Sequence, residues 1–290
     1  MMQIHSPGRV DLHMHSTFSD GQHQPEVLVE QARLANLTAI AITDHDHLDA
    51  YFPARAEAEK GKPLEVISGV EITCEYAGSE VHLLGYFVDP KNAALQQALQ
   101  DLRESRERRF HEMVRILRGL GAKIDDAEIE KLAAQKGTLG RRHLGEILFR
   151  TKQVSAIFYA FVRFLNRPEI TSLPKKRLPV REGIRLVHEA GGISSWAHPP
   201  STCTMDQIRE WQSFGLQALE AEYPWSNPSH GKKLRVMASQ LGLAITGGSD
   251  FHGIEPANRK VGAKGITDGE FLQLKSLLNG ERADIRLPRE

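Results

Sequence analysis

Seven short apolar segments of high β-propensity recur along this chain of 290 residues, and most are separated by segments with helical spacing. The predicted strands are the segment ending at residues 11–15, and residues 37–43, 64–71, 80–88, 193–197, 216–221 and 243–246. The predicted helices between and after them are residues 25–36, 50–60, 180–190, 232–240 and 268–278. Such alternation predicts an α/β fold built on a parallel sheet.

The alternation is interrupted between about residues 91 and 179. Helical patterns without strand signals cover residues 91–118, 125–136, 141–150 and 154–165, and a basic connector at 174–179 follows. We therefore expect a helical subdomain, residues 95–179, inserted into a main domain formed by residues 1–94 and 180–290. The insert is basic: residues 95–181 contain 19 Lys and Arg against 10 Asp and Glu, although the whole chain has 37 of each kind. A basic surface suits phosphate-bearing ligands, although a solvated helical face is the more common origin of such a charge run.

The composition predicts a cytoplasmic protein. The hydrophobic content of 40% is ample for a core, and no apolar run approaches the ~20 residues that cross a bilayer. The N-terminus lacks the apolar stretch of a secretory signal. Cys74 and Cys203 have neither zinc-site spacing nor disulfide density, so reduced thiols are expected. No obligatory protein partner is indicated.

Ionisable side chains gather near the ends of the predicted strands. His13 and His15 are two residues apart in a strand, so both imidazoles point to one side. Strand ends converge on one face of a β/α barrel, which predicts a common pocket. His82 lies near a strand start instead, and a core histidine is the alternative for it. The nine candidate metal ligands are His13, His15, Asp20, His45, Glu71, His82, His198, Asp250 and His252.

Histidine and carboxylate ligands without cysteine favour Mn, Fe, Zn or Mg ions. Nine ligands exceed what one ion can take, so two or three ions are expected. Ions about 3.5–4 Å apart stabilise the attacking and leaving oxygens of phosphoester hydrolysis. The chain contains no Gly-x-Ser-x-Gly elbow and no P-loop, which argues against a serine hydrolase and an NTPase.

The segments around the nine candidate ligands resemble the PHP (polymerase and histidinol phosphatase) family of metal-dependent phosphoesterases. The resemblance is to the subgroup with a helical insert, which contains 3′,5′-nucleoside bisphosphate phosphatases and a 5′-to-3′ exoribonuclease of short RNA. Gly140-Arg141-Arg142-His143 is similar to the Gly-Arg-Pro-His motif of that insert. The motifs that carry the resemblance are His13-Met14-His15, Ser19-Asp20-Gly21, Thr43-Asp44-His45-Asp46, Gly69-Val70-Glu71-Ile72, His82-Leu83-Leu84-Gly85-Tyr86, Ala197-His198-Pro199 and Gly248-Ser249-Asp250-Phe251-His252.

The resemblance implies a distorted, amidohydrolase-like (β/α)7 barrel that holds two or three ions, with Mn²⁺ favoured over Fe²⁺, Zn²⁺ and Mg²⁺. It implies that Glu71, Asp250 and His198 are catalytic, that Glu71 bridges two ions, and that a bridging hydroxide attacks phosphorus. Arg141, His143 and Ser19 would bind substrate, with a solvated helix start as the alternative for Arg141 and His143. The implied ligand sets are His13, His15, Glu71 and Asp250 for one ion, Glu71, His82 and His198 for a second, and Asp20, His45 and His252 for a third.

The expected substrates are nucleoside 3′,5′-bisphosphates, cleaved at the 3′-phosphate, and 5′-phosphorylated short RNA. The alternatives are a small monoester such as histidinol phosphate, and a non-catalytic nucleic-acid-binding module. No membrane association is expected. Phe158, Phe161 and Phe164 recur at helical spacing and are expected in the core, so a substrate of one to a few nucleotides is favoured over a long strand.

One departure from the family pattern concerns phosphate binding. Pro200 and Ser201 follow Ala197-His198-Pro199 where the subgroup usually has Gly-Arg, so a basic group is missing. Lys175, Lys176 and Arg177 are candidates to replace it, although we favour a solvated linker for this segment.

Overall fold

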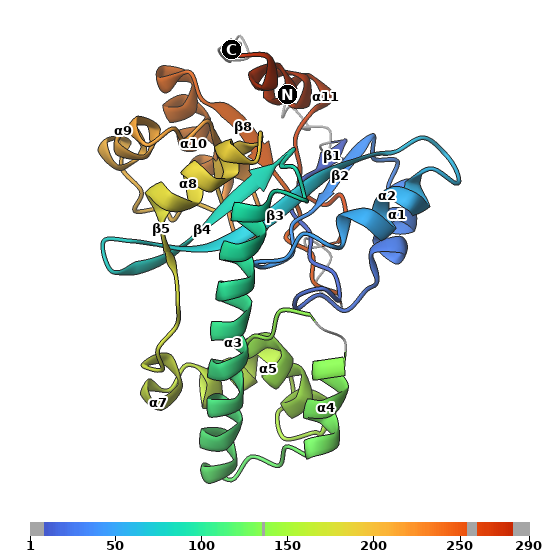
Figure 1. Cartoon of the computed structure of the whole chain (residues 1–290), viewed down its shortest axis with the longest axis vertical. Coiled ribbons are helices and arrows are strands. Elements are labelled where there is room, and N and C mark those ends of the chain that lie inside the picture. The colour runs from blue at the N-terminus through green and yellow to red at the C-terminus, as the bar shows by residue number, and fades with distance from the viewer. Residues whose placement is uncertain (1–8, 135–136, 254–259, 281–290) are drawn as a thin grey trace.

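The structure is a computed structural model that describes residues 9–134, 137–253 and 260–280. Its main body is a sheet with strand order β1-β2-β3-β4-β6-β7-β8, flanked by helices (Figure 1). The seven strands of this path confirm the predicted α/β barrel-like sheet. Their bounds are Val10–Asp11 (β1), Ala39–Ile42 (β2), Glu65–Tyr76 (β3), Ser79–Tyr86 (β4), Ile193–Trp196 (β6), Ala218–Glu222 (β7) and Ala244–Gly247 (β8).

The sheet is not entirely parallel, which corrects the prediction. β4 runs antiparallel to both β3 and β6 because β3 and β4 form a hairpin. Ala77 and Gly78 make the turn with φ of 49° and 76°, which suits a two-residue hairpin loop. A further two-residue strand, β5 (Leu178–Pro179), pairs with β3 in the connector that was expected to be a linker.

The sheet nearly closes on itself because the segments that follow β1 and β8 pair with each other. The amide of Leu12 donates to the Gly247 carbonyl at 3.1 Å, and the amide of Asp250 donates to the His13 carbonyl at 2.7 Å. His15 N–H donates in turn to the Phe251 carbonyl at 2.9 Å. This pairing places two predicted ligand segments side by side.

Helices cover the outside of the sheet. In Figure 1, α1 and α2 flank it on one side, and α8, α9 and α10 flank it on the other. Pro25 starts α1, where its missing N–H costs no helical hydrogen bond. The bounds are Pro25–Leu34 (α1), Tyr51–Ala58 (α2), Val180–Glu189 (α8), Met205–Ser213 (α9), Pro228–Leu241 (α10), Asp268–Ser276 (α11) and Leu277–Asn279 (η3). The helix α9 was not among the helices predicted from the sequence.

The helices of the predicted basic insert, called the basic region from here on, form a helical body below the sheet (Figure 1). Leu95, Leu99 and Leu102 of α3 belong to the core of the sheet, whereas Phe110 and Met113 of the same helix belong to a second core. This second core agrees with an inserted subdomain, whose boundaries at residues 95 and 179 stay a prediction. The helices are Ala93–Gly119 (α3), Asp126–Ala134 (α4), Arg141–Arg150 (α5), Ile157–Ala160 (α6), Phe161–Leu165 (η1) and Pro168–Thr171 (α7).

Among the helices that the structure describes, none is both long and apolar enough to cross a membrane.

Candidate metal centre and active site

Glu71 in β3 lies at the centre of a histidine cluster and is 1% exposed. Each of its carboxylate oxygens faces a different group of imidazoles. The distances to ring nitrogens are 2.8 Å (His82) and 3.0 Å (His198) for Oε1, and 3.0 Å (His45), 3.4 Å (His15) and 3.5 Å (His13) for Oε2. A carboxylate placed between two sets of ligands is able to bridge two metal ions.

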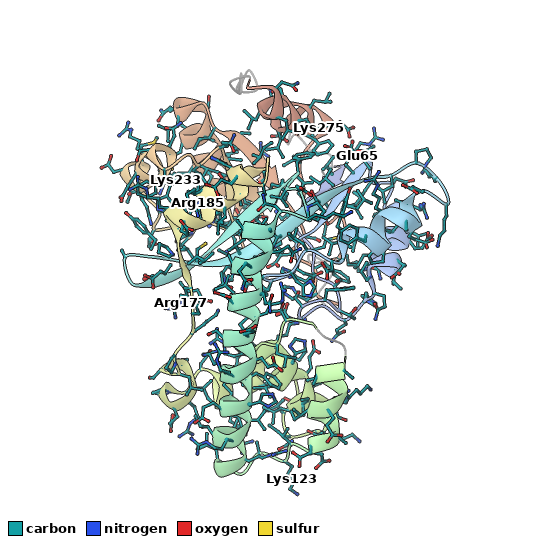
Figure 2. The ribbon with its side chains drawn as sticks, in the orientation of Figure 1. Glu65, Lys123, Arg177, Arg185, Lys233 and Lys275 are labelled. Carbon is teal, nitrogen blue, oxygen red and sulfur yellow. The ribbon has the colours of Figure 1, made fainter. Side chains whose placement is uncertain are left out.

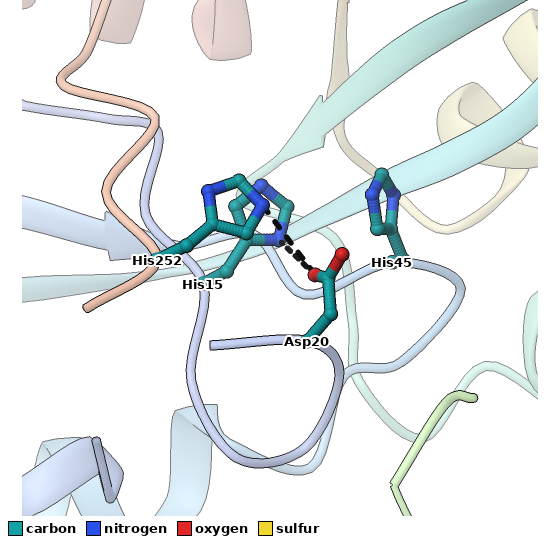
Figure 3. Close-up of side chains that lie close together, drawn as sticks. All are labelled: His15, Asp20, His45 and His252. Atoms are coloured by element: carbon teal, nitrogen blue, oxygen red, sulfur yellow. Dashed lines mark ion pairs between the residues drawn. The ribbon is translucent and has the colours of Figure 1, made fainter. Parts of the chain in front are cut away.

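A second part of the cluster surrounds His15 (Figure 3). Its Nε2 lies 3.1 Å from Asp250 Oδ1, and its Nδ1 lies 3.8 Å from Asp20 Oδ1. The same oxygen of Asp20 lies 3.4 Å from His252 Nε2. The ligand atoms of His15, Asp20, His45 and His252 all lie within 4.8 Å of one another. All nine predicted residues thus come together, although their roles as ligands stay a prediction.

The direction of β4 explains why His82 joins the cluster. Because β4 is antiparallel, its first half lies beside the C-terminal part of β3, where His82 pairs with Thr73. A residue near the start of β4 therefore reaches the edge where the parallel strands end. His82 Nδ1 lies 2.8 Å from Glu71 Oε1, so the residue belongs to the cluster, and its role as a ligand stays a prediction.

The charges of the cluster shift the pKa values of its members strongly. Burial by itself lowers the pKa of His82 and His252, but the attraction of Glu71 for His82 and of Asp20 for His252 outweighs it and raises each pKa to about 9. Burial disfavours the charged form of Glu71, yet the surrounding histidines hold its pKa well below the usual range. His45 differs, because burial dominates and lowers its pKa to about 4.

Four buried imidazole nitrogens lie 2.8–3.5 Å from the Glu71 carboxylate, yet none of them makes a hydrogen bond of good geometry with any described residue. They are His13 Nε2, His15 Nε2, His45 Nδ1 and His82 Nδ1. Buried polar atoms almost always make well-formed hydrogen bonds, so four ring nitrogens gathered around one carboxylate without such a bond fit a metal site. Neutral imidazole and carboxylate are the ligands of divalent metals, and the residues present fit such ions.

Buried hydrogen bonds hold the loops that carry these ligands. Asp44 accepts from Ser16 N at 2.7 Å and from the Ser16 and Ser19 hydroxyls at 2.5 Å, which fixes the loop after β1. Asp46, at φ 54°, accepts from Thr73 N and from Arg106 Nε, both at 2.7 Å. Arg106 belongs to α3, so the loop of His45 is tied directly to the first helix of the basic region.

Glu220 is a functional candidate that sequence analysis missed. It is fully buried in β7, where its Oε1 lies 2.9 Å from His13 Nδ1 and its Oε2 accepts from His198 N at 2.6 Å. A carboxylate on Nδ1 keeps the proton there and leaves Nε2 free for a metal. The only signal in the sequence was a glutamate in the middle of an apolar strand, where a charge needs a partner.

We expect Glu220→Gln to lower metal affinity or activity by about 10- to 100-fold, because the amide no longer holds the tautomer of His13. The measurement is a metal titration of the stripped variant, followed by turnover at saturating metal. Glu222→Gln on the same strand is the matched control, since Glu222 contacts Arg235 and Lys264 instead of the cluster. Equal metal affinity together with equal turnover in both variants would contradict the role of Glu220.

A pocket of about 130 Å³ lies between the cluster and the helical region, and its lining is rich in cations. Asp20, His45 and His82 form its cluster side, and Glu80 is its other acidic residue. The cations in the lining are Arg106, Arg109, Arg141, Arg142 and Lys175. Excess positive charge beside candidate metal ligands suits a phosphate group.

Lys175 lies in this pocket, so the expectation of a solvated linker is wrong for it. Its side chain is 10% exposed, and its Nζ lies 2.5 Å from Glu80 Oε1, which is itself 3.4 Å from His82 Nε2. Burial lowers the pKa of Lys175 to about 7. Arg177, on the connector between α7 and α8 (Figure 2), pairs with the other oxygen of Glu80 at 3.0 Å. Lys176 is 44% exposed, as a linker residue should be.

The three predicted substrate-binding residues lie at the boundary between the loop after β1 and α5. Arg141 lines the small pocket, and its guanidinium lies 5.9 Å from the centre of the Phe161 ring. His143 Nε2 lies 3.0 Å from the Ser19 carbonyl, and its Nδ1 accepts from Gly140 N. The Ser19 hydroxyl donates to Asp44. Both His143 and Ser19 thus bond to the protein, and their substrate-binding role stays a prediction.

The known proteins that this chain resembles include nucleotide and RNA hydrolases and a metal-dependent phosphoesterase, which agrees with a cluster of candidate metal ligands beside a cationic pocket. A 5′-3′ exoribonuclease Rnm of Escherichia coli is 30% identical over 249 residues, covering 83% of this chain and 84% of the relative. A 3′,5′-nucleoside bisphosphate phosphatase of Chromobacterium violaceum is 26% identical over 260 residues, covering 87% and 90%. A crystal structure described as a metal-dependent phosphoesterase from Bifidobacterium adolescentis superposes with a TM-score of 0.84 at 28% identity, covering 92% of this chain and 95% of that one. The PHP domain model matches residues 11–212, and the chain therefore belongs to the PHP domain family.

Proposed function

We propose that this metal-dependent phosphoesterase removes the 3′-phosphate of nucleoside 3′,5′-bisphosphates or degrades 5′-phosphorylated short RNA. The observation that carries the proposal is the small cationic pocket that shares Asp20, His45 and His82 with the ligand cluster. A phosphate in this pocket would touch both the candidate metal ligands and the arginines of the helical region. The relatives named as exoribonuclease and bisphosphate phosphatase support the nucleotide class of substrate.

The contacts of Glu71 support its assignment as the bridging ligand. Its Oε2 would join His13 and His15, together with Asp250, around one ion. Its Oε1 would join His82 and His198 around a second ion. Asp20, His45 and His252 would hold a third, and His15 lies close enough to share it. Manganese is the proposed metal because the family resemblance favours it, and the mixed imidazole and carboxylate set is also compatible with Fe²⁺, Zn²⁺ or Mg²⁺.

The bound ions and the residues of the chain would have different roles in hydrolysis. Divalent ions, when bound, supply Lewis-acid stabilisation of the phosphoryl oxygens and a nucleophilic water. Arg141 and Lys175 line the pocket from the helical side, where their charges hold the phosphate and compensate the charge that develops in the transition state. Lys175 thereby replaces the basic group that is missing after His198-Pro199.

Product analysis with three substrates tests the proposal. The Mn-loaded protein is incubated with adenosine 3′,5′-bisphosphate, a 5′-phosphorylated short RNA and histidinol phosphate. We expect inorganic phosphate and AMP from the first, or mononucleotides from the second, and no product after Asp250→Ala or His198→Ala. Turnover of histidinol phosphate alone would move the assignment to a small monoester. If the metal-loaded protein forms no product from any of the three substrates, a non-catalytic binding module would be favoured.

We expect Lys175→Met to lower kcat/KM for the nucleotide substrate by about 10- to 100-fold, because one charge-assisted hydrogen bond to phosphate is lost. Steady-state kinetics measures the effect. Lys176→Met is the matched control. The Lys176 side chain is 44% exposed, and its Nζ pairs with Asp101 at 2.6 Å, away from the pocket. If both variants retain wild-type kinetics, Lys175 does not bind the substrate.

A further inference from the structure

A second and larger cavity of about 980 Å³ opens between the loop of residues 17–22 and helices α4, α5 and α6. Two aromatic side chains in its wall are poorly buried: Phe158 is 69% exposed and Phe149 is 44% exposed. The expectation that Phe158 lies in the core is therefore wrong, whereas Phe164 is 8% exposed and does lie there. Exposed aromatic rings that line a cavity are typical of a binding site.

The two spaces are neighbours with common walls. Arg142 and Phe161 line both, and Gly21 and Gln22 line the large cavity next to Asp20 of the small pocket. Gln22 Nε2 donates to Glu146 Oε1 at 3.0 Å, so this loop is anchored to α5. The two shared residues place the small pocket and the large cavity side by side, which is the arrangement that a phosphate in one and its nucleoside in the other would require.

The sizes of the two spaces indicate how a substrate divides between them. The small pocket of about 130 Å³ has room for a phosphate group but lies well below the ~300–1,000 Å³ of typical small-molecule sites. The nucleoside part of a nucleotide needs more space than the small pocket offers. The adjoining cavity of about 980 Å³ provides that space.

We propose that the large cavity binds the nucleobase of the substrate, with Phe158 as the stacking surface and Phe149 as a second aromatic residue of the same lining. The inference rests on the proposed function and adds the part of the substrate that is recognised. A base has an apolar π-face that stacks on aromatic rings without regard to sequence. Two arginines in the wall are paired with glutamates, Arg142 with Glu146 and Arg150 with Glu128. Lys131 gives the wall an excess of positive charge, which suits an anionic nucleotide.

The test compares adenosine 3′,5′-bisphosphate with methyl riboside 3′,5′-bisphosphate, which has the same phosphates and no base. We expect the wild-type protein to prefer the base-bearing substrate in kcat/KM. Phe158→Ala should reduce that preference by about 5- to 140-fold, which corresponds to the ~1–3 kcal/mol of one base stack. Phe149→Ala is a second variant, and circular dichroism shows whether each remains folded.

Phe52→Ala is the matched control, because Phe52 is 43% exposed on α2 and does not line the cavity. We expect it to keep the wild-type preference. If the wild-type protein hydrolyses both substrates equally well, or folded Phe158 and Phe149 variants keep its preference, the nucleobase site is overturned while the phosphoesterase function stands. If the wild-type protein hydrolyses neither substrate nor short RNA, the proposed function itself fails.

Discussion

Glu71→Gln is expected to lower kcat by about 10³-fold or more, because Glu71 is the proposed bridging carboxylate and its loss would remove several kcal/mol of metal-based transition-state stabilisation. The substitution keeps the shape of the side chain but halves its capacity to bind metal, since an amide nitrogen is not a ligand for these ions. Both proposed ion sites that share Glu71 should be affected together. Metal content after dialysis should fall in parallel with turnover.

The matched control is Glu75→Gln, the same substitution four residues further along β3, where the side chain is exposed. It should retain wild-type metal content and kinetics. Elemental analysis and steady-state rates are measured on the same preparations, so that a loss of metal is separated from a loss of folding. A Glu71→Gln protein with full metal content and full activity would show that the cluster is not the catalytic centre.

Metal affinity is expected to rise steeply with pH between about 6.5 and 9. In the metal-free protein, Glu71 and Asp20 hold the pKa of His82 and His252 at about 9, so both rings carry a proton that an incoming ion must displace. Each imidazolium that deprotonates on binding increases affinity by about tenfold per pH unit over this range. Calorimetric titration of chelator-treated protein measures the slope. His82→Gln should reduce that slope, whereas pH-independent affinity would contradict the charge state proposed for both histidines.

The stability of the metal-free protein should change in the opposite direction over the same range. The folded pKa of His82 and His252 exceeds the unfolded value of 6.5, so their contribution is complete below pH 6.5 and is lost as pH rises towards 9. His45, with its pKa lowered to about 4, makes stability rise with pH between about 4 and 6.5. Urea unfolding with and without metal should therefore show the greatest stabilisation by metal near pH 9.

Local signals in the sequence predicted many elements well. The bounds of α5, residues 141–150, agree fully, because apolar side chains at helical spacing follow Gly140 in an extended conformation. The helix α9 was missed although it carries a signal: Thr204 caps it by accepting from the Gln207 amide. The continuation of β3 to Tyr76 was missed because the hairpin turn at Ala77-Gly78 was not recognised.

The site shows the same division between local and long-range information. The clustering of the nine candidate ligands was predictable because histidine and carboxylate side chains near so many strand ends are unusual without a shared ligand. Glu220 was not predictable as a partner of His13, since 207 residues separate them and only the closure of the sheet brings them together. The burial of Lys175 and the exposure of Phe158 likewise depend on how the helical region packs against the sheet.

The sequence by itself determined most strands, most helices, the basic region and the set of candidate ligands, because these follow from short-range periodicity and side-chain chemistry. Only the tertiary structure decided the direction of β4, the two faces of Glu71 and the separation of a small cationic pocket from a large aromatic cavity. Those features arise from contacts between segments distant in the chain, and such contacts leave no periodic pattern in a single sequence.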